Sequence, residues 1–232
     1  MKETKDIFFD LDHTLWDFDA NSAQTISELF KKYSLFSKLN CSAEDFFPVY
    51  LQINNDLWHL YDHGKISKEE LRITRFQRAF ENFNYSNERL ASQIDEEYIL
   101  TCPIKGVLLN GAVEVLQYLK ARDYNLHIVT NGFKEIQSIK LNTSNILAYF
   151  SSITTGECAK ANKPSNLIFD LAFKRSGANL MSSVFIGDNP QTDIVGAKNY
   201  GMKTIWYNSR NLPFVVEPDL EIQQLKELQH IF

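Results

Sequence analysis

The stretch Ile7-Phe8-Phe9-Asp10-Leu11-Asp12-His13-Thr14-Leu15, near the start of the chain, decides its fold. The apolar run 7–9 predicts a short strand that is buried on both faces. Asp10 and Asp12 follow where this strand ends, and in open parallel sheets the ligand crevice lies outside the carboxyl ends of the strands. Paired acids beside a buried strand are unfavourable unless a cation or a proton compensates their charge. This stretch is therefore the first indication of a metal site.

The composition is that of an ordinary globular protein, with 44% hydrophobic and 23% charged residues over 232 positions. The net charge of −5 argues against a nucleic-acid-binding protein, which usually carries a basic stripe. The sequence shows no apolar segment long enough to span a membrane and no signal-peptide pattern, so no membrane association is expected. The three cysteines lack C-x-x-C spacing, and their odd number fits a reducing, cytoplasmic location.

Residues 16–100 have the pattern of an all-helical block. Apolar residues recur every three or four positions in 20–33, and helix-capping patterns start at Ser42 and Ser67. Residues 87–100 predict a fourth helix, and the block contains no convincing strand pattern.

From residue 101 onward, helices and strands alternate. Strands are predicted at 126–129, 152–155, 184–186 and 203–207, and helices at 111–122, 133–141, 165–176 and 193–200, with a short strand and helix in 220–232. Such alternation forms βαβ units and a parallel sheet. The predicted fold is a Rossmann-like three-layer α/β/α core of residues 1–15 and 101–232. An all-helical cap domain, residues 16–100, is inserted after the first strand.

Polar residues at four strand ends or loops are predicted to gather along one edge of this sheet. They are Asp10 with Asp12, Thr130 with Asn131, Lys163, and Asp188 with Asp193. These carboxylates suit a hard divalent cation, most simply Mg²⁺, which takes oxygen ligands and often keeps substrate phosphate in its coordination shell. A phosphate dianion approaches so many acids only if Mg²⁺ and a lysine offset the repulsion.

With these motifs the chain resembles the haloacid dehalogenase superfamily of phosphohydrolases. The resemblance is carried by Asp10-Leu11-Asp12-His13-Thr14-Leu15, Thr130-Asn131, Lys163-Pro164 and Gly187-Asp188-Asn189-Pro190-Gln191-Thr192-Asp193, followed by Gly196-Ala197 and Gly201. Each motif alone has an ordinary explanation, such as a helix cap for the paired acids or a turn for Thr130-Asn131. Four motifs in order, each after a predicted strand or in a loop, favour the resemblance over those explanations.

The resemblance implies catalytic and metal-binding roles. Asp10 is the nucleophile that forms an aspartyl-phosphate, and Asp12 is the general acid and base. The side chains of Asp10 and Asp188 and the backbone carbonyl of Asp12 hold Mg²⁺. Asp193 belongs to the same acidic set, as a metal ligand or as the partner of Lys163, and a first-turn helix acid is its ordinary alternative.

The resemblance also implies groups that bind the phosphoryl group. Thr130 binds a phosphoryl oxygen, backbone N–H groups near Leu11 and Asn131 assist it, and Lys163 offsets the phosphoryl charge. Asp12 favours phosphoryl transfer over dehalogenation, because dehalogenases of this superfamily lack a carboxylate at that position.

Segment 12–18 and the aromatic-rich helical block look most like the nucleoside 5′-monophosphatase branch that prefers pyrimidine nucleotides. Trp58, His59 and Tyr61 are candidates for stacking on a base or sugar. Arg72 and Arg75 are candidates for binding an anionic group of the substrate. The alternative for Trp58 and Tyr61 is packing in the core. The alternative for Arg72 and Arg75 is an ordinary surface position on a helix.

We therefore expect a cytoplasmic, Mg²⁺-dependent phosphomonoesterase that acts on a small phosphorylated metabolite, with a nucleoside monophosphate as the leading candidate substrate. A sugar-phosphate or phosphoglycolate phosphatase, or a phosphoglucomutase-like enzyme, would share the same core. A non-catalytic regulatory protein could retain the fold, but the presence of Asp10, Asp12, Lys163 and Asp188 argues against it. Neither nucleic acid nor a membrane is an expected partner, and the expected oligomeric state is a monomer or a homodimer.

Overall fold

The computed structural model describes residues 4–213 and 215–232. The chain divides into two compact units, one of Met1–Phe18 with Gly106–Phe232 and the other of Asp19–Lys105. The boundaries expected from the sequence, at 15/16 and 100/101, fall a few residues before these. The assignment of the two units as core and cap domains stays a prediction.

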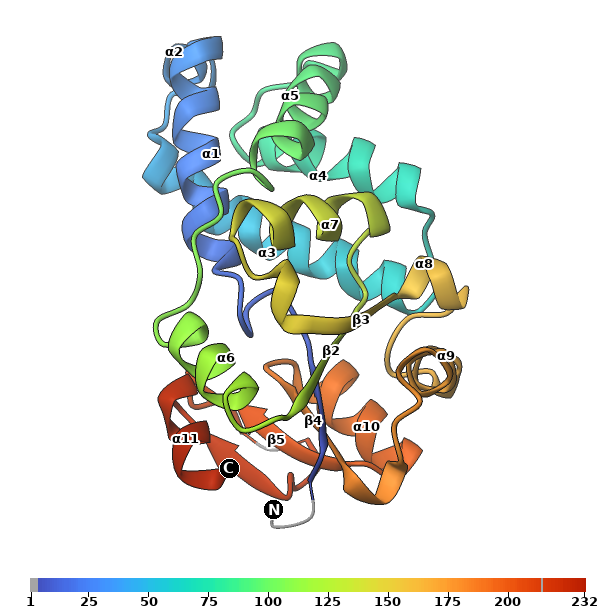
Figure 1. Cartoon of the computed structure of the whole chain (residues 1–232). Coiled ribbons are helices and arrows are strands. Elements are labelled where there is room, and N and C mark those ends of the chain that lie inside the picture. Colours follow the sequence, from blue (N-terminus) through green and yellow to red (C-terminus); the bar gives the residue numbers. More distant parts are fainter. Residues whose placement is uncertain (1–3, 214) are drawn as a thin grey trace. The chain divides into compact units, whose positions relative to one another are not determined.

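A parallel sheet forms the centre of the first unit (Figure 1). Within the described residues it has six strands in the order β3-β2-β1-β4-β5-β6, and all neighbouring strands are parallel. The strands are β1 (Asp6–Phe9), β2 (Asn125–Thr130), β3 (Phe150–Thr155), β4 (Ser183–Gly187), β5 (Lys203–Tyr207) and β6 (Leu220–Ile222). The first strand of the chain therefore lies in the sheet interior, between β2 and β4.

Helices cover both faces of this sheet, which confirms the predicted α/β fold. The helices are α6 (Ala112–Lys120), α7 (Lys134–Thr143), α8 (Gly156–Ala159), α9 (Asn166–Ser176), α10 (Val195–Tyr200) and α11 (Leu228–Ile231), with short turns at Leu147–Tyr149, Leu180–Ser182, Pro190–Ile194 and Leu225–Glu227. Residues of α9 and α10 pack with Phe8 of β1 and Phe185 of β4 in one core cluster. Figure 1 shows α6 and α11 on the other side of the sheet.

The short strand β1 is buried on both faces. Ile7, Phe8 and Phe9 are each at most 1% exposed. Successive side chains of a strand point to opposite faces, so Phe8 joins the cluster with α9 and α10 while Ile7 and Phe9 face the other layer. A strand buried on both faces has a continuous apolar sequence, which is why the run 7–9 predicted it.

The second unit consists of helices. They are α1 (Phe18–Tyr33), which begins at the end of the first unit, α2 (Leu35–Leu39), α3 (Ala43–Asp62), α4 (Lys68–Asn82) and α5 (Glu88–Thr101). Reciprocal bonds cap two of them, between Ser42 and Asp45 at the start of α3 and between Ser67 and Glu70 at the start of α4, as the sequence predicted. The short helix α2 was not predicted. Across the described ranges, no helix is long and apolar enough to cross a bilayer.

A buried ion pair lies inside the helical unit. Arg75 of α4 is 4% exposed, and its Nε donates to Oδ1 of Asp95 on α5 at 2.5 Å. Its guanidinium also lies 4.8 Å from the centroid of the Tyr98 ring. The interpretation of Arg75 as a surface arginine is therefore wrong. Because a buried charge is tolerated when it is paired, this arginine has a structural explanation within its own unit.

Candidate active site

Three strands end side by side at one edge of the sheet. β1 ends directly before Asp10, β2 ends with Thr130, and β4 ends with Gly187, directly before Asp188. Because β1 pairs with both β2 and β4, the polar residues that follow these three strands meet in space. The edge formed by the carboxyl ends is where ligands bind in parallel sheets of this kind.

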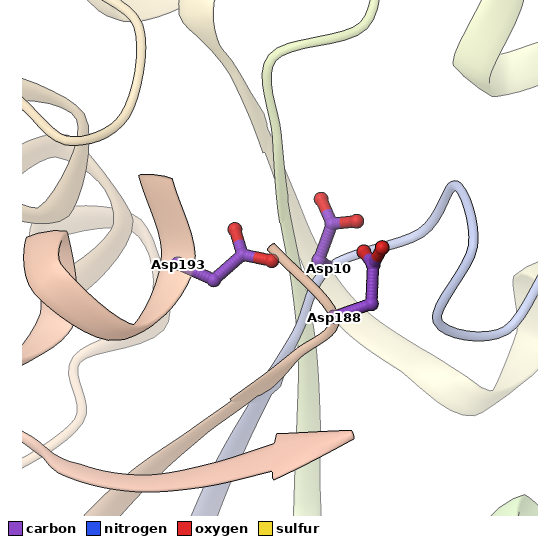
Figure 2. A group of neighbouring side chains, drawn as sticks. All are labelled: Asp10, Asp188 and Asp193. Atoms are coloured by element: carbon purple, nitrogen blue, oxygen red, sulfur yellow. The ribbon is translucent and has the colours of Figure 1, made fainter. Parts of the chain in front are cut away.

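Three carboxylates form a compact group at this edge (Figure 2). Asp10, Asp188 and Asp193 each offer one oxygen, and these oxygens lie within 4.8 Å of one another. Asp193 comes from the turn Pro190–Ile194, which has π-helical hydrogen bonding, and it is 1% exposed. The group does not include the side chain of Asp12. The metal contact that the family resemblance implies for Asp12, through its backbone carbonyl, stays a prediction.

Lys163 connects two of these acids. Its Nζ donates to Oδ1 of Asp10 at 2.6 Å and to Oδ1 of Asp193 at 2.7 Å, and Lys163 itself is 2% exposed. The second oxygen of Asp193 accepts the backbone N–H of Asn189 at 3.0 Å. Both oxygens of Asp193 are thus engaged within the protein. This arrangement suits Asp193 as the partner of Lys163 better than as a metal ligand.

The side chain of Asn131 holds the backbone of Lys163. Its Oδ1 accepts the N–H of Lys163 at 2.7 Å, and its Nδ2 donates to the carbonyl of Lys163 at 3.0 Å. These two bonds fix the loop from which the lysine side chain reaches the acids. The sequence predicts a role only for the backbone N–H near Asn131, because a Thr-Asn-Gly turn contains no sign of which distant backbone its side chain will bind.

The electrostatics of the group favour the binding of a cation. Burial raises the pKa of Asp10 to about 7, the charge of Lys163 opposes this rise, and the charge of Asp193 adds to it. Burial, together with the charges of Asp193 and Asp10, holds the pKa of Asp188 well above its ordinary value. Burial disfavours the charged form of Lys163, but the neighbouring carboxylates of Asp10 and Asp193 outweigh it and raise the pKa of the lysine. The positive charges that oppose these shifts are Lys163 and, toward Asp188, also Arg210.

The donor set fits a hard divalent cation. The three acids offer only oxygen atoms, which are the ligands that Mg²⁺ and similar cations prefer. A bound divalent charge would also stabilise the ionised forms of Asp10 and Asp188, which burial disfavours.

Leu11 lies shortly after the end of the central strand β1, and Thr130 is the last residue of the strand β2. The carbonyl of Leu11 accepts the N–H groups of Leu15 and Trp16 at 2.9 Å, so the chain turns sharply after Asp10. Thr130 is 2% exposed, and its Oγ1 accepts the N–H of Gly132 at 3.1 Å. This bond uses an oxygen lone pair and leaves the hydroxyl proton available to a ligand oxygen. The roles of Leu11 and Thr130 in binding a phosphoryl group stay predictions.

Two further residues contact Asp188. The hydroxyl of Thr14 donates to its Oδ1 at 3.4 Å, and the indole Nε1 of Trp206 on β5 donates to its carbonyl at 2.8 Å. Thr14 belongs to the first motif, so its position in the sequence could have indicated this contact. Trp206 lies in a strand pattern, and nothing in the sequence distinguishes it from an ordinary core aromatic.

The candidate substrate contacts Trp58 and Arg72 belong to the helical unit. Trp58 and Tyr61 are both half-buried, with their rings edge-to-face at a centroid distance of 5.5 Å, so neither is a fully buried core residue. Arg72 is also half-buried, and its Nε lies 3.5 Å from Oδ2 of Asp95. A role for Trp58 and Arg72 toward a substrate stays a prediction.

The fold and the acidic group at its strand ends are those of a haloacid dehalogenase-like hydrolase. The family model of that description matches residues 7–207, and the chain belongs to this family. It is 33% identical over 227 residues to the pyrimidine 5′-nucleotidase PynA of Streptococcus pneumoniae, covering 97% of this chain and 93% of that protein. It is 31% identical over 228 residues to the pyrimidine 5′-nucleotidase YjjG of Escherichia coli, covering 97% of this chain and 96% of that protein.

A solved structure of the putative hydrolase YfnB of Bacillus subtilis is also similar. The two chains share 27% sequence identity with a TM-score of 0.89, covering 99% of this chain and 98% of that one. That structure is described as bound to magnesium and as revealing interdomain movement. The similarity extends over both the sheet unit and the helical unit of the present chain.

Proposed function

We propose that this chain is a Mg²⁺-dependent phosphomonoesterase that acts through an aspartyl-phosphate on a small phosphorylated metabolite. The substrate that we propose is a pyrimidine nucleoside 5′-monophosphate. The observation that carries the proposal is the position of Asp10. This acid follows the interior strand β1, bonds to Lys163, and lies in the group with Asp188 and Asp193. A nucleophilic carboxylate needs this kind of fixed, charge-compensated position beside the phosphorus atom.

The residues divide the reaction into two steps. In the first step an oxygen of Asp10 attacks phosphorus, and the ester oxygen leaves with a proton from Asp12. In the second step Asp12 takes a proton from water, the water oxygen attacks the same phosphorus, and inorganic phosphate leaves Asp10. Lys163 and the hydroxyl of Thr130 stabilise the charge on the phosphoryl oxygens in both steps.

The same group of acids would bind the metal. Asp10 and Asp188 would hold it together with the backbone carbonyl of Asp12, while Asp193 keeps Lys163 in place. When bound, Mg²⁺ supplies positive charge that reduces the repulsion between the carboxylates and a phosphate dianion. The chemistry of the oxygen donors supports this assignment, and a related structure is described as magnesium-bound.

The substrate proposal rests on the two relatives named as pyrimidine 5′-nucleotidases. We assign the helical unit Asp19–Lys105 as the cap that provides specificity, with Trp58 as a base contact and Arg72 as an anion contact. A sugar phosphate, phosphoglycolate and a mutase reaction on a sugar phosphate remain the competing activities.

A panel of phosphate esters tests the substrate proposal. We expect pyrimidine nucleoside 5′-monophosphates to have a kcat/KM at least about tenfold above those of sugar phosphates and phosphoglycolate, because a pocket that contacts the base discriminates by a factor of this order. The Trp58→Leu and Arg72→Gln variants should lose nucleotide turnover but keep turnover of p-nitrophenyl phosphate. A sugar phosphate as the best substrate would overturn the nucleotide assignment, and binding without turnover would support a regulatory protein.

Removal of divalent cations tests the metal proposal. Chelation is expected to lower kcat by about 100-fold or more, and added Mg²⁺ should restore it, because a bound cation contributes several kcal/mol of charge stabilisation. The Asp188→Asn variant should need a higher Mg²⁺ concentration for half-maximal activity. Asp170→Asn, an exposed acid on α9 in the same unit, is the matched control. Full activity of the wild-type enzyme in chelator would contradict the proposal.

A further inference from the structure

Lys140 of α7 is a buried lysine that the reaction described above does not use. It is 5% exposed, whereas lysines are almost never buried unless they have a partner. It lies on a helix that follows the strand β2 and its Thr130-Asn131 motif. A lysine held this far from water must have its ammonium group compensated by neighbouring residues.

The ammonium group of Lys140 has one charged partner and two aromatic neighbours. Its Nζ donates to Oδ1 of Asp12 at 2.5 Å. It lies 4.2 Å from the centroid of the Trp16 indole and 5.9 Å from that of the Phe18 ring. The face of an aromatic ring attracts a cation, so the two rings and the carboxylate together hold the ammonium group. All four residues belong to the sheet unit.

This contact engages only one oxygen of Asp12. No other hydrogen bond to this carboxylate is present among the described residues, and the side chain of Asp12 remains 23% exposed. Because Oδ1 is occupied by an N–H donor, Oδ2 is the oxygen that can carry a proton to a ligand or accept one from water. The rotation of the carboxylate about its last bond is also restricted, because it would break the bond to a lysine that cannot follow it.

We propose that Lys140 is a positioning residue that fixes Asp12 for proton transfer through Oδ2. The inference rests on the proposed function. In the first step the proton on Oδ2 moves to the ester oxygen as its bond to phosphorus breaks and the bond from Asp10 to phosphorus forms. In the second step Oδ2 takes a proton from the attacking water as the bond from Asp10 to phosphorus breaks. Lys140 donates no proton in either step.

A substrate pair with different leaving groups separates this role from simple packing. Nitrophenolate leaves phosphorus without a proton, whereas the 5′-alkoxide of a nucleoside needs one. The ratio kcat/KM reports only the steps up to departure of the leaving group, so it is insensitive to the later hydrolysis of the aspartyl-phosphate. A residue that positions the general acid must therefore affect kcat/KM for the nucleotide much more than kcat/KM for p-nitrophenyl phosphate.

The experiment measures kcat/KM for both substrates, with Mg²⁺ present, in the wild-type enzyme and in Lys140→Met. We expect the variant to lose about 100-fold on the nucleotide, the lower range of a general acid's contribution, and less than about threefold on p-nitrophenyl phosphate. Lys140→Arg keeps a cation over the Trp16 ring and should lose less, about tenfold, again only on the nucleotide. Lys198→Met is the matched control, because Lys198 also ion-pairs in the sheet unit, with Asp219 at 3.6 Å, but away from Asp12.

Each outcome decides the proposal. Equal losses on both substrates would make Lys140 a structural residue, and unchanged activity on both would remove it from the reaction. Should Lys140→Met melt below the assay temperature, Lys140→Arg is judged by the same difference between substrates. A wild-type enzyme without turnover of any phosphate ester would overturn the proposed function and this inference together, whereas an active enzyme with unselective variants would overturn this inference alone.

Discussion

Replacing Asp10 by asparagine is expected to lower kcat/KM for every phosphate ester by at least about 10⁴-fold, the order of loss seen when a covalent nucleophile is removed. Asparagine keeps the shape of the side chain and an oxygen that can accept from Lys163, but its amide does not attack phosphorus. When the reaction of the wild-type enzyme is quenched during turnover, mass spectrometry should detect a phosphoryl group on the peptide that contains Asp10. The same peptide of the variant should carry none.

The fold of this variant should survive. Burial raises the pKa of Asp10 to about 7 and the charge of Asp193 adds to this effect, so the site disfavours a second carboxylate charge. Without bound metal, the melting temperature of Asp10→Asn at pH 8 should therefore equal or exceed that of the wild type. Asp6→Asn, at the other end of β1, is the control and should keep activity within about threefold, as expected for a change outside the site. Full activity of Asp10→Asn would exclude the aspartyl-phosphate route.

The elements of the fold could be predicted because their patterns are local. The continuous apolar run 7–9, the alternation of strands and helices after residue 101, and the capping boxes at Ser42 and Ser67 each depend on residues close in sequence. The order of the strands could not be predicted in the same way, since it depends on which strands pair across long connections. Once β1 and β4 are known to be parallel neighbours, however, the meeting of Asp10 and Asp188 follows from topology alone.

The partners of buried polar side chains could not be predicted from the sequence. Lys140 contacts Asp12 across 128 positions of sequence, and α7 shows no feature that distinguishes this lysine from a solvated one. A surface position is likewise the ordinary expectation for Arg75 on its helix, yet Asp95 of α5 pairs with it in the interior. In both cases the burial of a charge is favourable only because a distant segment provides an opposite charge. Hydrophobic periodicity in the sequence does not indicate such pairs.

Replacing Lys163 by methionine is expected to reduce both activity and stability. Loss of its ammonium leaves the buried carboxylates of Asp10 and Asp193 without their shared donor, and breaking a buried pair costs about 3–5 kcal/mol of unfolding free energy. Activity should fall by about 10²–10³-fold, the effect of removing one preorganised group that stabilises charge in the transition state. Denaturant unfolding measures the loss of stability, and steady-state kinetics measure the loss of activity. Lys198→Met is the control: it breaks a half-exposed ion pair and should cost less than about 1 kcal/mol of unfolding free energy.

The pH dependence of this stability loss has a definite sign. In the metal-free wild type the pKa of Asp10 is raised by burial to about 7, and Lys163 is the group that opposes the rise. In Lys163→Met the folded-state pKa of Asp10 must therefore lie above 7. Above the wild-type value the folded variant binds more protons than the folded wild type, so the variant loses stability relative to the wild type as pH increases. We expect a larger difference in unfolding free energy at pH 8.5 than at pH 6.

A second substitution separates the stability loss from the loss of activity. In Lys163→Met/Asp193→Asn only one of the two carboxylates that Lys163 bonds remains charged, and asparagine can still accept the backbone N–H of Asn189. The double variant should therefore regain part of the unfolding free energy, while its activity stays as low as that of Lys163→Met because the phosphoryl charge still lacks the ammonium group. Recovery of activity together with stability would show that Lys163 acts only by holding the acids in place. A double variant no more stable than the single one would show that repulsion between Asp10 and Asp193 is not what the lysine relieves.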